Sequence, residues 1–308
     1  MTHKIRGALA PVLTPFDQNF EPDTTRFINH CRWLVDNQAG LAIFGTNSEA
    51  ASVSQAERLR LTEALIEAGI PADRMMPGTG ACALPDAVEL ARHASGHGVA
   101  GLLVLPPYFY KNLTEDGVFA YYAEIIERVG NGCAPIYLYH IPQMTMVPIT
   151  LSLIERLLKR YPGKVVGAKD SSGDWANTKA MLDNFARDGF EVFPASESFL
   201  SAALPLGAAG CISATVNMNP AGIHRLYANW NKPEGTELQA EADAVRKVFQ
   251  GGYMIAAMKQ AVADFTGQPE WATVRPPLVK LDTAQREKLD VDLRTIGFSM
   301  PGYPSPTR

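Results

Sequence analysis

The sequence predicts an α/β protein, a (β/α)8 TIM barrel with a C-terminal helical extension. The chain has 308 residues, 46% of them apolar, which is enough to bury one large core. Short apolar runs recur at intervals of about 20 to 35 residues, the length of one strand plus one helix. The segments between them have helical periodicity and helix-start signals. This alternation predicts parallel strands joined by crossover helices.

Eight apolar runs are the predicted strands, and they lie at residues 8–13, 41–44, 74–77, 101–105, 135–139, 165–169, 191–194 and 210–213. Eight strand-helix units match a barrel of about 250 residues. In such a barrel the reactive groups lie on the loops that follow the carboxyl ends of the strands. The residues directly after each run are therefore the first place to look for chemistry.

Helix starts are recognisable between these runs. Ser54 and Glu57 form a capping box ahead of an apolar-periodic segment, and Thr114 and Thr150 are expected to cap two further helices. The eighth barrel helix is expected to begin near Pro220. These signals assign the helices that separate the predicted strands.

The last quarter of the chain has no strand-like run. Residues 237–249, 254–265 and 283–294 have helical spacing, and the Arg275-Pro276-Pro277 sequence interrupts the last two segments. The predicted division is a barrel over residues 1–230 and a helical extension over 231–308. No low-complexity linker separates them, so the extension is expected to pack on the barrel.

Composition limits the classes of partner. The net charge is −4 and the isoelectric point about 5.9, without a long basic run, so small molecules rather than nucleic acid are expected. No run approaches a membrane span, and the first six residues contain no apolar signal stretch. We therefore expect a cytoplasmic protein. The four cysteines are far apart and form no CxxC, which favours reduced and mostly core thiols; they are Cys31, Cys82, Cys133 and Cys211.

Lys169 is the most informative single residue. It ends the apolar run 165–169, where burial would lower its pKa towards the neutral amine that attacks carbonyls. The run 135–139 ends in Tyr139, a phenol that can relay protons. An amine nucleophile and a phenol at neighbouring strand ends suggest Schiff-base chemistry on a keto acid.

A keto acid also needs a site for its carboxylate. After the second predicted strand, the turn of Gly45, Thr46, Asn47, Ser48 and Glu49 offers hydroxyl and backbone N–H donors. The same turn can equally be an ordinary strand-to-helix connection. Together with the lysine and the phenol, it completes the set that a keto-acid imine requires.

Four motifs resemble those of the dihydrodipicolinate synthase/N-acetylneuraminate lyase superfamily, and they lie at residues 45–49, 139–142, 167–174 and 210–215. The resemblance extends from Gly7 to about Tyr227. It implies that Lys169 forms the imine with pyruvate or a related carbonyl and that Tyr139 shuttles protons. It also implies that Thr46 and Asn47 hold the keto-acid carboxylate, with Thr46 joining the relay. Ile212 matches the position whose backbone carbonyl lies near the imine.

The resemblance implies further roles. In sugar-acid lyases of the superfamily, the positions matching His140, Ser171, Ser196 and Glu197 contact substrate hydroxyls, which favours a polyhydroxylated 2-keto acid. The superfamily also forms homotetramers built as dimers of dimers, in which a tyrosine is lent to a neighbouring subunit. Tyr108 and Tyr110 are both open for that role.

Two departures from the family pattern are informative. Members that make the lysine precursor carry an arginine five residues after the strand-end tyrosine, and this chain has Met144 there. A thioether cannot replace a guanidinium for binding a carboxylate, so dihydrodipicolinate synthase activity is not expected. In the turn, Ser48 replaces the usual glycine and Asn47 replaces the second hydroxyl residue.

The sequence therefore predicts a Schiff-base lyase that cleaves or forms a C–C bond, with a 2-keto acid and an aldehyde as partners. A dehydratase using the same imine and a non-catalytic keto-acid-binding barrel remain alternatives. No cofactor or metal is expected. His93 and His97 share a helical face, but no nearby carboxylate or third ligand is expected to complete a metal site. The Gly78-Thr79-Gly80 sequence lacks the acidic partner of a dinucleotide site.

Overall fold

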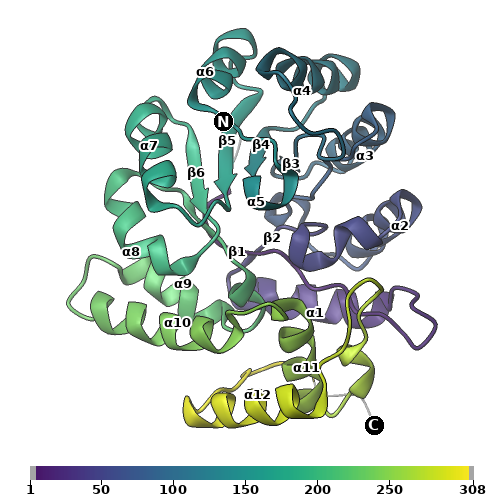
Figure 1. The fold of residues 1–308 in the computed structure, drawn as a ribbon, viewed down its shortest axis with the longest axis vertical. Coiled ribbons are helices and arrows are strands. Elements are labelled where there is room, and N and C mark those ends of the chain that lie inside the picture. Colours follow the sequence, from purple (N-terminus) through teal and green to yellow (C-terminus); the bar gives the residue numbers. More distant parts are fainter. Residues whose placement is uncertain (1–4, 305–308) are drawn as a thin grey trace.

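A computed structural model describes residues 5–304 and contains a barrel of parallel strands surrounded by helices (Figure 1). Its strands are β1 (Gly7–Ala10), β2 (Gly40–Leu41), β3 (Leu102–Val104), β4 (Ile136–His140), β5 (Val165–Asp170), β6 (Glu191–Pro194) and β7 (Gly210–Ile212). They pair in two parallel arcs, β2-β1-β7 and β3-β4-β5-β6. The predicted α/β barrel is confirmed.

The third predicted strand closes one gap between these arcs, but it is not a regular ladder strand. It bridges β2 at Met75 and β3 at Gly78 only. Pro77 has no N–H to donate, which limits the pairing that this segment can make. On the other side of the barrel, the Ala209 N–H donates to the Val192 carbonyl at 3.0 Å. These contacts complete the ring.

Two glycines explain why the strands approach so closely here. A Cβ on Gly78 would lie 2.1 Å from the Phe44 carbonyl oxygen, and a Cβ on Gly80 would lie 2.4 Å from the Leu105 nitrogen. Neither position has room for a side chain. The glycine pair that imitates a dinucleotide motif therefore serves strand packing.

The surrounding helices are α1 (Thr24–Asp36), α2 (Gln55–Glu67), α3 (Leu84–Gly96), α4 (Glu115–Val129), α6 (Leu151–Arg160), α7 (Trp175–Phe185), α8 (Leu200–Ala203) and α9 (Pro220–Asn229). A one-turn helix, α5 (Pro142–Thr145), follows β4. Ser54 caps α2 with a reciprocal bond from its own N–H to Glu57. Thr114 and Thr150 cap α4 and α6. The expected helix starts are confirmed.

The core has two parts. The larger lies between the strands and the helices. A smaller cluster fills the barrel interior, and it contains Ile5, Leu9, Ala42, Met76, Leu103, Tyr137, Tyr139, Ile141, Phe193, Ala209 and Ile212. Because side chains alternate along a strand, odd-numbered residues of β4 point inward and even-numbered ones outward. This alternation decides which strand-end residues can face a substrate.

The C-terminal helices α10 (Gly235–Phe249), α11 (Met254–Thr266) and α12 (Thr283–Thr295) lie together along one side of the barrel (Figure 1). Two buried ion pairs join them to barrel loops. Arg246 of α10 binds Glu197 at 3.0 Å, and Lys259 of α11 binds Glu49 at 2.6 Å. The predicted division at residue 230 falls between α9 and α10.

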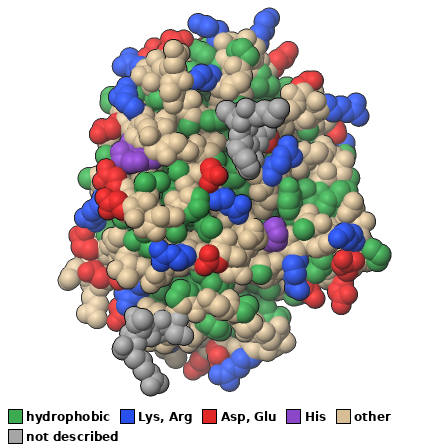
Figure 2. All heavy atoms as spheres, turned by 180° about the vertical axis from the view of Figure 1, so that it is seen from behind, with side chains coloured by type: hydrophobic (Ala, Val, Ile, Leu, Met, Phe, Trp, Pro, Cys, Tyr) green, Lys and Arg blue, Asp and Glu red, His purple; other side chains and the backbone are tan. Residues whose placement is uncertain are grey.

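The surface mixes charges of both signs. On the face shown in Figure 2, acidic and basic side chains are interspersed, and neither gathers into a patch. Among residues 5–304, no helix is long and apolar enough to cross a membrane. Residues 1–4, part of the segment in which the sequence predicts no signal stretch, lie outside the described range. The four cysteines are unpaired; Cys82 is exposed and the other three are buried.

Candidate active site

Lys169 lies near the carboxyl end of β5, directly opposite Tyr139 in the β4–β5 register. Its side chain is only 3% exposed. The Lys169 Nζ donates to the Tyr139 hydroxyl at 3.2 Å and lies 4.3 Å from the centre of the phenol ring. The amine is therefore held inside the barrel mouth rather than in bulk solvent.

Thr46 completes a three-residue contact with this pair. Its Oγ1 lies 2.9 Å from the Tyr139 hydroxyl, so the phenol is hydrogen-bonded to both the amine and a second hydroxyl. Ser171, two residues after Lys169, contributes to lowering the pKa of the phenol. The structure thus brings together residues 46, 139 and 169 from three different strand ends.

These neighbours adjust the acidity of the phenol. Burial raises the pKa of Tyr139, but the charge of Lys169 and hydrogen bonds from Thr46, Lys169 and Ser171 outweigh it. The pKa of the phenol consequently lies below its ordinary value. A more acidic phenol exchanges protons with a substrate more readily near neutral pH.

The turn after β2 is arranged to receive an anion. The Gly45 N–H donates to the Ser48 hydroxyl at 3.1 Å, and Glu49 adopts a left-handed conformation with φ 55°. Ser48, which replaces the family glycine, therefore stabilises the turn. Within residues 5–304, the backbone N–H groups of Thr46 and Asn47 make no hydrogen bond. Two adjacent free N–H groups suit a carboxylate.

A buried ion pair supports this turn from behind. Glu49 and Lys259 are both fully buried, and the second carboxylate oxygen of Glu49 accepts from the Arg275 N–H at 2.9 Å. Burial lowers the pKa of Lys259 to about 8, although Glu49 opposes this effect. The C-terminal extension therefore holds one end of the catalytic turn in place.

A cavity of about 370 Å³ opens beside the phenol and the turn. Its polar lining comprises Gly45, Thr46, Glu49, Ser52, Arg58, Tyr108, Tyr139 and Thr145. Most of the remaining wall is apolar and is formed by Phe44, Ala50, Ala51, Leu103, Leu105, Ile141, Met144, Ile255, Pro277 and Leu278. The last residues of this wall come from the C-terminal extension, so the extension shapes the space available to a substrate.

Other predicted site residues lie elsewhere. His140 points away from the barrel interior, and its Nδ1 accepts from the Ile149 N–H at 3.0 Å. Burial lowers its pKa. Ser196 caps the following turn by accepting from the Ser198 N–H. The structure does not place these two residues in the cavity wall.

Glu197 is engaged within the protein. Its carboxylate is fully buried and accepts hydrogen bonds from Ser213 and Thr215 while pairing with Arg246. Both oxygens therefore already have partners, which contrasts with the predicted contact to substrate hydroxyls. Ile212 lies in β7 with its side chain in the interior cluster, as expected of the strand that neighbours β1.

The two tyrosines predicted for an inter-subunit relay differ in position. Tyr108 is half-buried and lines the cavity. Tyr110 is 72% exposed and stacks edge-on against Phe109. The structure therefore separates one tyrosine that faces this subunit's own cavity from one that projects outward.

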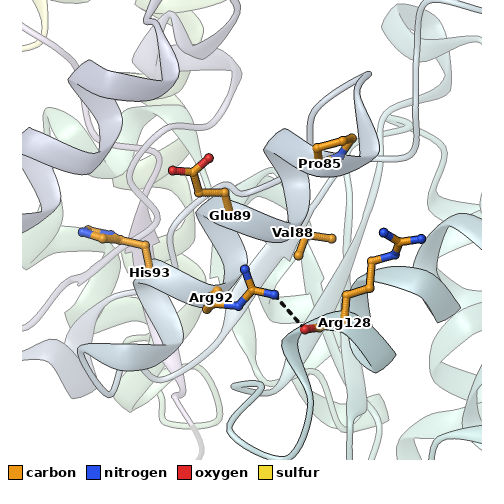
Figure 3. Close-up of a pocket in the computed structure, with 6 residues that line it drawn as sticks. All are labelled: Pro85, Val88, Glu89, Arg92, His93 and Arg128. Atoms are coloured by element: carbon orange, nitrogen blue, oxygen red, sulfur yellow. Dashed lines mark hydrogen bonds between the residues drawn. The ribbon is translucent and has the colours of Figure 1, made fainter.

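The expectation that no carboxylate lies near His93 and His97 is wrong. Glu63 of α2 lies 3.1 Å from the His93 Nε2, because α2 and α3 pack side by side. The three groups cluster within 4.8 Å on the surface. Figure 3 shows His93 on α3 among the residues that line a surface cavity, together with Arg92 and Arg128. We assign no ion to this cluster.

Arg58 and the Glu49–Lys259 pair are the features that sequence reasoning missed. Arg58 follows the capping box of α2, where a solvated arginine is the ordinary expectation. Lys259 is 210 residues from its partner. No local pattern distinguishes either cation from a surface residue.

Comparisons with known proteins agree with this geometry. Residues 4–296 match the model of the dihydrodipicolinate synthetase family. An uncharacterized DapA-like lyase from Chloroflexus aurantiacus is 33% identical over 91% of this chain and 93% of its own length. The crystal structure of dihydrodipicolinate synthase from Agrobacterium tumefaciens superimposes with a TM-score of 0.86 at 28% identity, covering 95% of this chain and 99% of that one. The E. coli protein YagE, solved in complex with pyruvate, shares the fold, with a TM-score of 0.86 at 23% identity over 96% of this chain and 99% of its own.

Proposed function

This chain belongs to the dihydrodipicolinate synthetase family, and from that premise we propose that it is a Schiff-base lyase acting on a 2-keto acid. The observation that carries the proposal is the Lys169 amine held 3.2 Å from the Tyr139 hydroxyl, which in turn lies 2.9 Å from Thr46. An amine, a phenol and a second hydroxyl in one chain of contacts can attack a ketone and move its protons.

The proposed reaction begins with the keto-acid carboxylate on the free N–H groups of Thr46 and Asn47. The Lys169 amine then adds to the ketone carbon, the carbonyl oxygen leaves as water, and a protonated imine forms. Tyr139 carries the protons that addition and dehydration require. The imine is the electron sink for the next step.

In a 4-hydroxy-2-keto acid, loss of the proton from the 4-hydroxyl breaks the C3–C4 bond. The electron pair moves into the imine, and an aldehyde and an enamine result. Protonation of the enamine at C3 and hydrolysis of the imine release pyruvate and restore Lys169. Condensation is the same sequence reversed. Tyr139 is the proton carrier in both directions.

The cavity wall supports this enclosure. Ile255, Pro277 and Leu278 of the C-terminal extension line it together with apolar residues of the barrel loops. Apolar walls exclude water and so protect the imine from premature hydrolysis. A cytoplasmic location and a homotetramer with sites near the tight interface complete the proposal.

Borohydride trapping tests the proposal. Incubation with pyruvate and borohydride should add one reduced pyruvate to the peptide that contains Lys169, as read by mass spectrometry. Lys169→Ala should remove the adduct while remaining folded. No adduct on the wild-type protein would favour a non-catalytic binding barrel and would reject the lyase.

The alternative within the same chemistry is a dehydratase. After removal of a C3 proton, the imine of a 2-keto-3-deoxy sugar acid can expel the 4-hydroxyl as water instead of cleaving the C3–C4 bond. Product analysis separates the two, because the aldolase releases pyruvate and the dehydratase retains the full carbon chain.

A further inference from the structure

Arg58 is a buried cation in the cavity wall whose role the proposed reaction leaves open. It lies on α2, is only 9% exposed, and lines the same cavity as Thr46 and Tyr139. Its Nη2 donates to the Ala50 carbonyl, and its Nε donates to the Val53 carbonyl at 3.3 Å. The remaining nitrogen, Nη1, makes no hydrogen bond within residues 5–304.

Arg58 also lacks an anionic partner. In the part of the chain that the structure describes, no carboxylate lies within ion-pair distance of its guanidinium. Burial lowers the pKa of Arg58. The neighbouring Tyr108 phenol supplies no counter-charge, because burial raises its own pKa above the ordinary value. A desolvated cation without a counter-ion is costly to a fold.

Three other cations that anchor barrel loops, each with a side chain at most 15% exposed, are arranged differently. Lys259 pairs with Glu49, Arg246 with Glu197, and Arg275 with Glu57. Each of these cations has a carboxylate of the same chain beside it. Arg58 has no such carboxylate partner. It lines the cavity beside Tyr139, where an anionic ligand can supply the missing negative charge.

The wall between these polar groups adds a second constraint. Phe44, Leu103, Leu105 and Ile141 line the cavity along with Met144. By the family resemblance given above, Met144 takes the position of the arginine that binds the substrate carboxylate. A substrate whose middle part is uncharged and apolar, and whose far end reaches the Arg58 guanidinium, fits this lining better than a substrate with many hydroxyls.

We propose that the part of the substrate beyond the keto acid carries an anionic group, a carboxylate or a phosphate, and that Arg58 binds it together with the Tyr108 hydroxyl. The inference rests on the proposed function, because the keto-acid end is placed by Lys169. Arg58 then takes over, from a different helix, the role that Met144 cannot perform.

The test uses imine trapping, so it does not require the natural substrate. Borohydride trapping on Lys169 is measured against concentration for 2-oxo dicarboxylates of increasing length, from 2-oxoglutarate to 2-oxopimelate. Each is compared with the 2-oxo monocarboxylate of the same chain length. For phosphate, 2-keto-3-deoxygluconate is compared with its 6-phosphate.

At one chain length, the compound with the second anionic group should half-saturate trapping at a concentration about tenfold to hundredfold lower than the compound without it, the range of one charge-assisted hydrogen bond. Comparison of the dicarboxylate series with the phosphate pair shows whether the preferred anion is a carboxylate or a phosphate. Arg58→Gln should abolish this preference without altering trapping of pyruvate, and Arg58→Lys should retain part of it. Arg92→Gln is the control, because Arg92 also donates to a backbone carbonyl but lies on the surface at α3 (Figure 3).

Three other outcomes would contradict the inference. If pyruvate is trapped but no compound with a second anionic group is preferred, the inference is wrong and the proposed function stands. If Arg58→Gln weakens trapping equally for compounds with and without the second anionic group and lowers the melting temperature, Arg58 only fastens the loop that contains Ala50 and Val53. If pyruvate gives no adduct on Lys169, the proposed function fails and this inference fails with it.

Discussion

Replacing Lys259 with methionine should destabilise the protein and disturb the catalytic turn. The Lys259 ammonium and the Glu49 carboxylate are both fully buried and 2.6 Å apart. Methionine has a similar volume, so the change removes the charge without opening a large void. It leaves the Glu49 carboxylate with the Arg275 N–H at 2.9 Å but without its ammonium partner.

The expected loss is about 3 to 5 kcal/mol, the cost of breaking a buried pair from one side. For a chain of this size that corresponds to a fall in melting temperature of roughly 10 °C. Because Glu49 ends the turn that contains Thr46, trapping of pyruvate on Lys169 should also slow. No residue in the turn itself is changed.

The measurement is a four-member cycle of wild type, Lys259→Met, Glu49→Gln and the double variant, unfolded in urea at pH 7. The double variant should lose less stability than the sum of the single variants, because neither isolated charge remains buried. A Lys259→Met protein within about 1 kcal/mol of the wild type would refute the reasoning. Additive single effects would show that the two side chains do not act as a pair.

Three further predictions concern other parts of the molecule. Tyr139→Phe should lower kcat by about a hundredfold to ten-thousandfold while the protein stays folded, because Lys169 loses its proton carrier; a loss under tenfold in steady-state kinetics would argue against the relay. Burial lowers the pKa of His30 to about 4, below its ordinary 6.5, so the unfolded chain binds a proton that the folded protein does not, and stability should fall as pH drops from about 6.5 towards 4. Urea unfolding should give a free energy about 2 kcal/mol smaller at pH 5 than at pH 7 from this group, and His30→Gln should remove that difference. Gly80→Ala should be strongly destabilising because its Cβ would meet the Leu105 nitrogen at 2.4 Å, and an unchanged melting temperature would contradict the close strand approach.

Much of the fold was readable from local patterns. Apolar runs and capping residues such as Ser54 act over a few neighbouring residues, so they report strands and helix starts directly. The pairing of the third predicted strand was not readable in this way. Pro77 has no N–H for a regular ladder, and the neighbouring strands decide where the segment pairs. The missing acidic partner already argued from the sequence against a dinucleotide site at Gly78 and Gly80, and the structure supplied their packing role.

The sequence by itself determined the barrel and the chemical types at its mouth, since Lys169 and Tyr139 lie near the carboxyl ends of strands, Thr46 follows a strand, and parallel strands end at one rim. Only the tertiary structure decided which polar residues face the cavity. The His140 side chain points away from the barrel interior. Glu197 pairs with Arg246, and Glu49 pairs with Lys259, in each case with a residue far away in the sequence. The tertiary structure also left Arg58 buried without a counter-ion. Charge pairing across a fold depends on distances in space, which the spacing of residues along the chain does not encode.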